Sequence, residues 1–111
     1  MKITLTTTGH RSGKPRAVPL YAWDDADRLV VVGSWGGSAT DPDWVRNLRA
    51  DPLATITKRR TVLDVRATEV DGPERDRLWK LVVESFPMYA SYQRKTDRVI
   101  PLFVLETVDA A

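Results

Sequence analysis

The chain contains no cysteine and only one histidine, His10, among its 111 residues. Disulfide frameworks and thiol nucleophiles are therefore excluded, because both need cysteine. Zinc sites and Ser-His-Asp triads are disfavoured, since one histidine supplies too few metal ligands and no catalytic partner lies near it in the sequence. We predict no metal site in this protein.

Long hydrophobic runs and a strong charge excess are also missing. The longest apolar runs have the length of a strand, and the first four residues, Met1-Lys2-Ile3-Thr4, do not begin a signal-peptide core. Seventeen basic and fifteen acidic residues leave a net charge of +2, which is not the balance of a nucleic-acid-binding protein. We therefore expect a single cytoplasmic domain over residues 1–111, with no nucleic-acid partner and no integral membrane segment.

Strand patterns recur along the chain. In the first, Ile3, Leu5 and Thr7 fall on one face of an alternating run. In the third, residues 29–32 form a nearly continuous apolar run, which predicts a strand buried on both faces. The six predicted strands span residues 2–8, 16–23, 28–34, 53–58, 62–70 and 99–106.

Short helices are predicted between some of these strands. Trp44, Val45 and Leu48 share one face of the first helix. The predicted helices cover residues 42–50, the segment from Pro73 to the break at Phe86-Pro87, and residues 88–95. Short strands in hairpins with two or three short helices favour an α+β fold centred on a small barrel, ending in a short tail over residues 109–111.

A glycine-rich turn lies between the third predicted strand and the first helix. Gly33, Gly36 and Gly37 allow positive φ or a close approach to a ligand, and Asp41 before Pro42 is predicted to cap the helix. Free N–H groups and the helix dipole would favour an anion there. A purely structural turn is the competing interpretation, and the turn alone favours it, because its spacing matches neither a Walker loop nor a dinucleotide fingerprint.

The turn from His10 to Arg16 groups three basic side chains, Arg11, Lys14 and Arg16. The hairpin between predicted strands two and three can bring this turn beside the glycine turn, and the two turns together would form a phosphate or carboxylate pocket. A solvated turn explains the composition equally well. We interpret His10 as a surface polar residue rather than a catalytic one.

Tyr89 and Tyr92 stand three residues apart on one face of the third helix. Phe86 and Met88 beside them are interpreted as core residues. A phenol needs a polar partner, which favours a functional position for the two tyrosines. Trp35, inside the glycine turn, is expected to lie against a ligand or a partner subunit.

Together these residues make the chain similar, nearly end to end, to the deazaflavin-dependent nitroreductase family, relatives of the split β-barrel flavin-binding proteins. The resemblance implies a six-stranded split barrel, like the FMN-binding split barrels, that binds coenzyme F420. It is carried by Leu5-Thr6-Thr7-Thr8-Gly9, Arg11-Ser12-Gly13, Pro15-Arg16, Pro19-Leu20-Tyr21, Ser34, Gly36-Gly37, Pro42, Trp44, Asn47-Leu48, Pro52, Tyr89, Tyr92, Thr96-Asp97-Arg98 and Ile100-Pro101.

The resemblance also implies where the coenzyme lies. Its phosphate and glutamate tail would be held by the side chains of Arg11, Lys14 and Arg16 and by the backbone at Ser34, Gly36 and Gly37. Its ring would lie along Pro19, Leu20, Tyr21 and Val32, with Trp44 and Asn47 as supports.

By the same resemblance, the reduced coenzyme gives a hydride to a small electron-poor acceptor, such as a quinone, a nitro-aromatic or an activated alkene. Because the cofactor supplies the hard chemistry, the protein needs only to orient the rings, exclude water and steady the developing charge. Tyr89 and Tyr92 would face the substrate. Tyr89 or Ser34 would then donate a hydrogen bond or a proton to the acceptor.

The chain departs from the family pattern in a few places. His10 and Trp35 stand where family members often carry basic residues, so fewer fixed charges hold the tail, and Trp35 would instead pack over the coenzyme. Phe86 replaces a frequent tyrosine. We expect no counterpart of the helical segment that commonly precedes the first strand. An FMN-binding split-barrel protein and a non-catalytic F420 carrier are the alternative functions, and a homodimer and a peripheral membrane location are left open.

Overall fold

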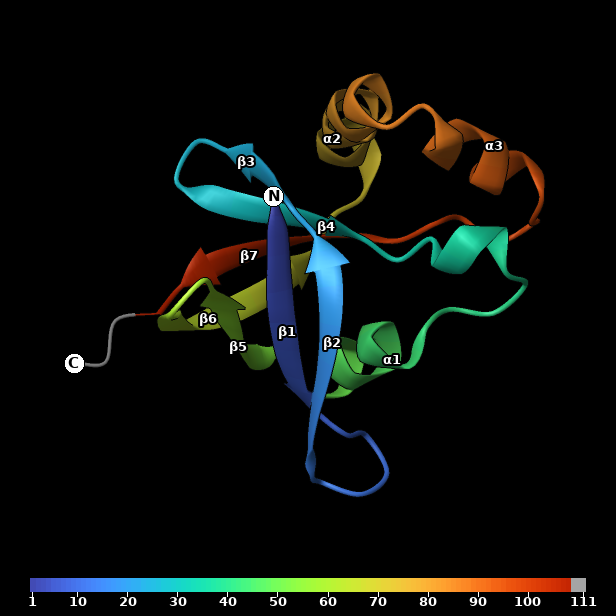
Figure 1. Cartoon of the computed structure of the whole chain (residues 1–111). Helices are drawn as coiled ribbons and strands as arrows, with labels where there is room; N and C mark the ends of the chain where they lie inside the picture. The colour runs from blue at the N-terminus through green and yellow to red at the C-terminus, as the bar shows by residue number, and fades with distance from the viewer. Residues whose placement is uncertain (109–111) are drawn as a thin grey trace.

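Figure 1 shows the computed structural model, which describes residues 1–108. The predicted tail over residues 109–111 lies outside the described residues. Within the described part, the chain forms seven strands, three α-helices and one short 3-10 helix. In chain order these are β1 (Lys2–Thr8), β2 (Pro15–Tyr21), β3 (Trp23–Asp25), β4 (Arg28–Val32), the 3-10 helix η1 (Trp35–Gly37), α1 (Asp43–Ala50), β5 (Leu53–Lys58), β6 (Thr61–Glu69), α2 (Gly72–Ser85), α3 (Met88–Arg94) and β7 (Leu102–Thr107).

One antiparallel sheet contains all seven strands, in the order β2-β1-β5-β6-β7-β4-β3. The sheet curls strongly, with α1 at its lower side and α2 and α3 at its upper side in Figure 1. Because of this curl, β2 at one end of the order contacts β4 near the other end. The predicted α+β class is confirmed.

The predicted strand over residues 16–23 is in fact two strands. Ala22 is fully buried between them, where its N–H donates to the carbonyl oxygen of Met1 at 2.7 Å and its own carbonyl accepts from the Met1 amino group at 2.8 Å. There the chain leaves β2 and enters β3, which pairs with β4 at the opposite end of the sheet. The count of six strands is therefore wrong by one, because the alternating pattern continues through the point where the chain changes partners.

Strand β4 separates two hydrophobic cores. Val31 packs with Leu5 and Trp44 in the core inside the curled sheet. Val30 and Val32 face a second core, to which α2 and α3 contribute. Burial on both faces confirms the prediction for this strand, and it places the loop after Val32 at the border of both cores.

The predicted helices match closely. Helix α1 buries Trp44, Val45 and Leu48, as their shared face predicts, and it also buries Asn47. Helix α2 begins with Gly72 and Pro73 and ends before Phe86, and α3 follows directly. Within residues 1–108, no helix combines the length and the apolarity that crossing a membrane requires.

Strand β7 begins later than the pattern over residues 99–106 predicts. The N–H of Ile100 donates to Oε1 of Gln93 in α3 at 2.9 Å, and the carbonyl of Pro101 accepts from the N–H of Gly33 at 2.9 Å. Proline has no N–H for a ladder, so this segment bonds to α3 and to the loop after β4 instead. Residues 98–101 thereby become part of the support of that loop.

Candidate functional site

Two cavities adjoin between β2, α1 and the loop after β4. The first, called here the basic cavity, has a volume of about 410 Å³ and is lined by Thr7, Gly9, His10, Arg11, Ser12, Arg16, Ala17, Val18, Asp43, Trp44 and Asn47. The second, called the aromatic cavity, has a volume of about 340 Å³ and is lined by Val18, Pro19, Leu20, Tyr21, Val32, Ser34, Trp35, Pro42, Trp44 and Tyr89. Val18 and Trp44 line both cavities, so the two cavities lie side by side, and together they are called the groove here.

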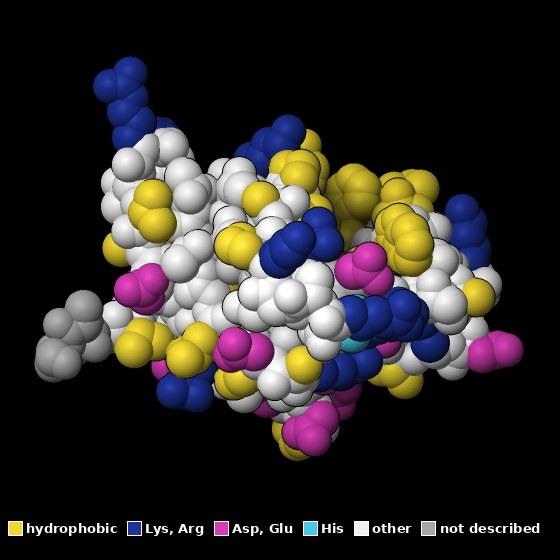
Figure 2. Space-filling view, turned by 90° about the horizontal axis from the view of Figure 1, so that it is seen from below, with side chains coloured by type: hydrophobic (Ala, Val, Ile, Leu, Met, Phe, Trp, Pro, Cys, Tyr) yellow, Lys and Arg dark blue, Asp and Glu magenta, His cyan; other side chains and the backbone are white. Residues whose placement is uncertain are grey.

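The two ends of this groove differ in charge. Figure 2 views the molecule from the side of the β1–β2 turn, where Lys and Arg side chains gather around the histidine and hydrophobic side chains lie beside them. Arg11 and Arg16 supply the positive charge of the basic cavity, whereas the walls of the aromatic cavity are largely apolar. An elongated molecule with a flat ring and an anionic tail fits such a groove.

Most of the predicted cofactor residues line the groove, and several do not. Arg11, Arg16, Trp44 and Asn47 line the basic cavity, and Pro19, Leu20, Tyr21, Val32, Ser34, Trp35 and Trp44 line the aromatic cavity. The predicted residues that line neither of these two cavities are Lys14, Gly36, Gly37 and Tyr92.

Gly37 serves a close approach within the protein. Its φ is +80°, and a Cβ added there would lie 2.7 Å from the carbonyl oxygen of Tyr92 and 3.0 Å from the Cα of Tyr92. Only glycine therefore lets η1 pack against α3 in this way. Trp35, two residues earlier, is 61% exposed and lines the aromatic cavity. Gly37 thus has the positive φ that the sequence predicts, but its close neighbour is α3.

The prediction that Asp41 caps α1 is wrong. Pro42 occupies the N-cap position, and no side-chain hydrogen bond caps the helix. The Asp41 carboxylate instead accepts hydrogen bonds from Arg98 at 2.7 Å and Arg49 at 2.8 Å. Two guanidinium groups therefore offset the negative charge near the groove, and Arg49 continues the network through a two-pronged contact with Glu69 at 2.8 Å.

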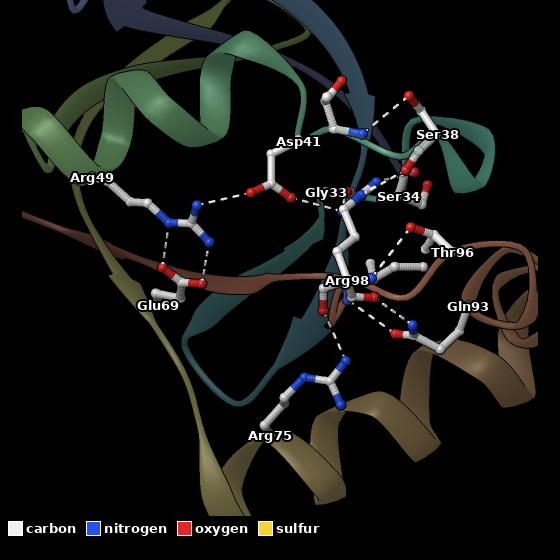
Figure 3. Close-up of polar contacts among 12 residues, drawn as sticks. Gly33, Ser34, Ser38, Asp41, Arg49, Glu69, Arg75, Gln93, Thr96 and Arg98 are labelled. Atoms are coloured by element: carbon white, nitrogen blue, oxygen red, sulfur yellow. Dashed lines mark hydrogen bonds and ion pairs between the residues drawn. The ribbon is translucent and has the colours of Figure 1, made fainter.

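Arg98 holds the loop between β4 and α1, as Figure 3 shows. Its guanidinium donates to the carbonyl oxygens of Ser34 at 2.7 Å, Ser38 at 2.7 Å and Gly33 at 3.1 Å, besides Asp41. The side chain is only 13% exposed. In the sequence, Arg98 stands out only through the family resemblance. Its role in holding the loop could not be predicted, because its partners lie 57 to 65 residues away in the chain.

Asn47 holds the basic cavity together. Its side chain is buried in α1, where Nδ2 donates to Oγ1 of Thr7 in β1 at 2.9 Å. Its Oδ1 accepts from the backbone N–H of His10 at 2.9 Å and lies 2.6 Å from Nδ1 of the same residue. One amide therefore joins helix, strand and turn.

Tyr89 is the tyrosine that reaches the aromatic cavity. It is buried, with ring centroids of Phe86 at 4.8 Å, Trp23 at 5.5 Å and Tyr92 at 6.2 Å. Burial raises the pKa of Tyr89 to about 12, so the phenol is neutral at physiological pH. Its hydroxyl forms no hydrogen bond with residues 1–108, and it is available as a donor to a bound molecule.

A family model and a similar protein of known sequence identify the same family. The model of the family described as F420H(2)-dependent quinone reductase matches residues 1–107. An F420H(2)-dependent quinone reductase of Mycobacterium tuberculosis is 34% identical over 106 residues, which cover 93% of this chain and 71% of the relative.

Two solved structures are similar in both fold and sequence. One is described as an F420-H2 dependent reductase, with a TM-score of 0.85, 43% identity and coverage of 95% of this chain and 93% of that one. The other is described as a domain-swapped dimer, with the same TM-score and identity and coverage of 95% and 79%.

Proposed function

The chain belongs to the F420H(2)-dependent quinone reductase family, and on that premise we propose that it reduces a quinone or a similar electron-poor acceptor with reduced coenzyme F420. The observation that carries the proposal is that the basic and aromatic cavities adjoin at Val18 and Trp44. A groove with one cationic end and one flat apolar end suits a deazaflavin with a phosphate and glutamate tail.

Arg11 and Arg16 are the residues that we propose for the tail. Both line the basic cavity, and a guanidinium can donate two parallel hydrogen bonds to a phosphate or carboxylate. Lys14, from the same turn, would act through its charge at longer range, since it does not line the cavity. The backbone of Gly36 and Gly37 belongs to this proposal as well, although Gly37 also packs against α3.

The ring site that we propose is the aromatic cavity. Pro19, Leu20 and Val32 give it apolar walls, and Tyr21 and Trp35 stand at its exposed side. When bound there, the reduced coenzyme supplies the hydride, and the walls keep water away and hold the two reactants in contact.

Tyr89 is the proposed proton or hydrogen-bond donor to the acceptor. A quinone oxygen gains negative charge as the hydride arrives, and a neutral phenol can stabilise that charge. Its hydroxyl is not engaged within residues 1–108, and its high pKa suits a donor rather than a base. Ser34 is the second candidate donor, whereas Tyr92 packs against Tyr89 and would act by fixing its position.

Titration with oxidised F420 and, in parallel, with FMN tests the proposal. We expect tight binding of F420, followed by reoxidation of the reduced coenzyme when a quinone is added. Retention of FMN without F420 binding would favour an FMN-binding protein, and F420 binding without turnover of any acceptor would favour a carrier.

The assembly and the detailed fold also belong to this proposal. Because β2 contacts β4 without pairing to it, we interpret the curled sheet as a split barrel. A relative at 43% identity is described as a domain-swapped dimer, which supports a homodimer. The cytoplasmic location stays a prediction from the sequence.

A further inference from the structure

The hydrogen bonds of Asn47 determine which nitrogen of His10 carries a proton. The backbone N–H of His10 can only donate, and it donates to the Asn47 side chain at 2.9 Å. The amide atom facing it is therefore the oxygen, and the contact of the amide nitrogen with Oγ1 of Thr7 agrees with this orientation.

The same oxygen lies 2.6 Å from Nδ1 of His10. An amide oxygen only accepts hydrogen bonds, so Nδ1 must carry a hydrogen. In the neutral ring Nε2 then holds a lone pair, and in the charged ring Nε2 becomes a second donor. Because Asn47 occupies Nδ1, Nε2 is the nitrogen left for a ligand.

The charged groups around this imidazole are mostly positive. Arg11 from the turn and Arg16 from β2 line the cavity with it, and Lys14 belongs to the same turn. From α1, Asp43 is the one acidic residue lining the cavity, and Arg46 pairs with it at 3.3 Å. A cavity of this composition attracts an anion, and a bound anion favours the charged form of a neighbouring imidazole.

We propose that His10 is an anion-binding residue of the coenzyme site, and that its Nε2–H donates to the phosphate or a carboxylate of the F420 tail. This inference rests on the proposed function. Only the charged imidazole has an Nε2–H to donate, so coenzyme binding is coupled to proton uptake and affinity falls as the pH rises. Arg11 and Arg16 keep their charge as the pH rises, and they provide the affinity that remains at high pH.

The dissociation constant of F420 for wild type and His10→Gln, measured from pH 5.5 to 8.5, tests the proposal. Dividing the two constants at each pH cancels any titration of the coenzyme itself. We expect His10→Gln to bind about tenfold more weakly at low pH, the size of one charge-assisted hydrogen bond, and nearly as well as wild type at high pH. His10→Arg should bind F420 tightly at both low and high pH. Arg16→Gln should bind F420 more weakly than wild type by a factor that does not change with pH.

A ratio that does not change with pH would overturn the assignment of His10 while leaving F420 binding intact. Absence of F420 binding in wild type at every pH would overturn the proposed function as well. His10 is exposed, so its replacement should not prevent folding.

The tautomer is tested without coenzyme. Nitrogen NMR of tag-free protein reports one histidine only, and we expect the Nδ1–H form in neutral wild type and its loss in Asn47→Ala. An Nε2–H form in wild type would contradict the proposal.

Discussion

The basic and aromatic cavities meet at Val18 and Trp44, but different kinds of structure build them. The positive charges of the basic cavity come from the β1–β2 turn and the start of β2, within seven residues of one another in the chain, and a single buried amide fixes that turn to α1. The aromatic cavity takes its walls from β2, β4, η1, α1 and α3, and Arg98 fixes the loop between β4 and α1 from 57 to 65 residues away. Binding charge can thus be local in sequence, whereas the shape of the reaction site depends on distant contacts.

Loss of the Arg98 contacts should have the largest effect on stability and activity. It should disturb the aromatic cavity, whose loop Arg98 holds, more than the basic cavity. Arg98→Met leaves three carbonyl oxygens and part of the Asp41 charge without a partner. We therefore expect the free energy of unfolding to fall by about 2–4 kcal/mol and quinone reduction to be lost. Urea unfolding and steady-state kinetics measure the two effects. Arg94→Met, an exposed arginine of α3, is the matched control, and equal losses in both variants would contradict the assigned role.

Tyr89→Phe should act on the aromatic cavity alone. The hydroxyl has no partner within residues 1–108, so stability and F420 affinity should stay close to wild type. Loss of the donor should lower kcat by about a hundredfold. Stopped-flow oxidation of the reduced coenzyme measures this step, and Tyr92→Phe, which lies behind Tyr89, should lose much less. Full activity in Tyr89→Phe would remove the tyrosine from the reaction.

Arg11→Gln should act on the basic cavity alone. It removes one charged donor from the tail site, and F420 should bind about tenfold more weakly while kcat at saturating coenzyme is unchanged. Fluorescence titration at two salt concentrations measures the loss and its screening. Arg60→Gln, in the exposed β5–β6 turn, is the control with the same charge change, and a similar loss there would indicate a non-specific field effect.

The smallest expected effect is on the stability of the fold, through Asp25, which lines neither cavity. The hydrogen bond from Arg77, opposed by partial burial and reinforced by Arg28, lowers the pKa of Asp25 from 3.8 to about 2. A carboxylate with a lowered folded pKa stabilises the fold above the unfolded pKa, and this contribution is lost as the pH falls from about 4 to about 2. Asp25→Asn should therefore be less stable than wild type at pH 7, with a gap in melting temperature that closes near pH 2. A constant gap would contradict this linkage.

The same division between local and distant contacts explains what the sequence could predict. The alternation of β1, the apolar run of β4 and the face of α1 are local patterns, and all three are confirmed. The break at Ala22 escaped prediction because only the sheet order shows that β2 and β3 lie at opposite ends.

The candidate site follows the same rule. The basic turn and the apolar residues of β2 were visible as short stretches, and they do line the groove. Asp41 looked like a helix cap because capping is a local signal, yet its partners Arg49 and Arg98 come from elsewhere in the chain. The hydrogen bonds between His10 and Asn47 join residues that are 37 positions apart, and no local sequence pattern predicts them.

A crystal structure with oxidised F420 bound tests the central claim most directly. We predict the ring in the aromatic cavity beside Tyr89 and the anionic tail within hydrogen-bond distance of Arg11 or Arg16, with the molecule passing Val18 and Trp44. A ring bound in the basic cavity, or outside the groove altogether, would contradict this account.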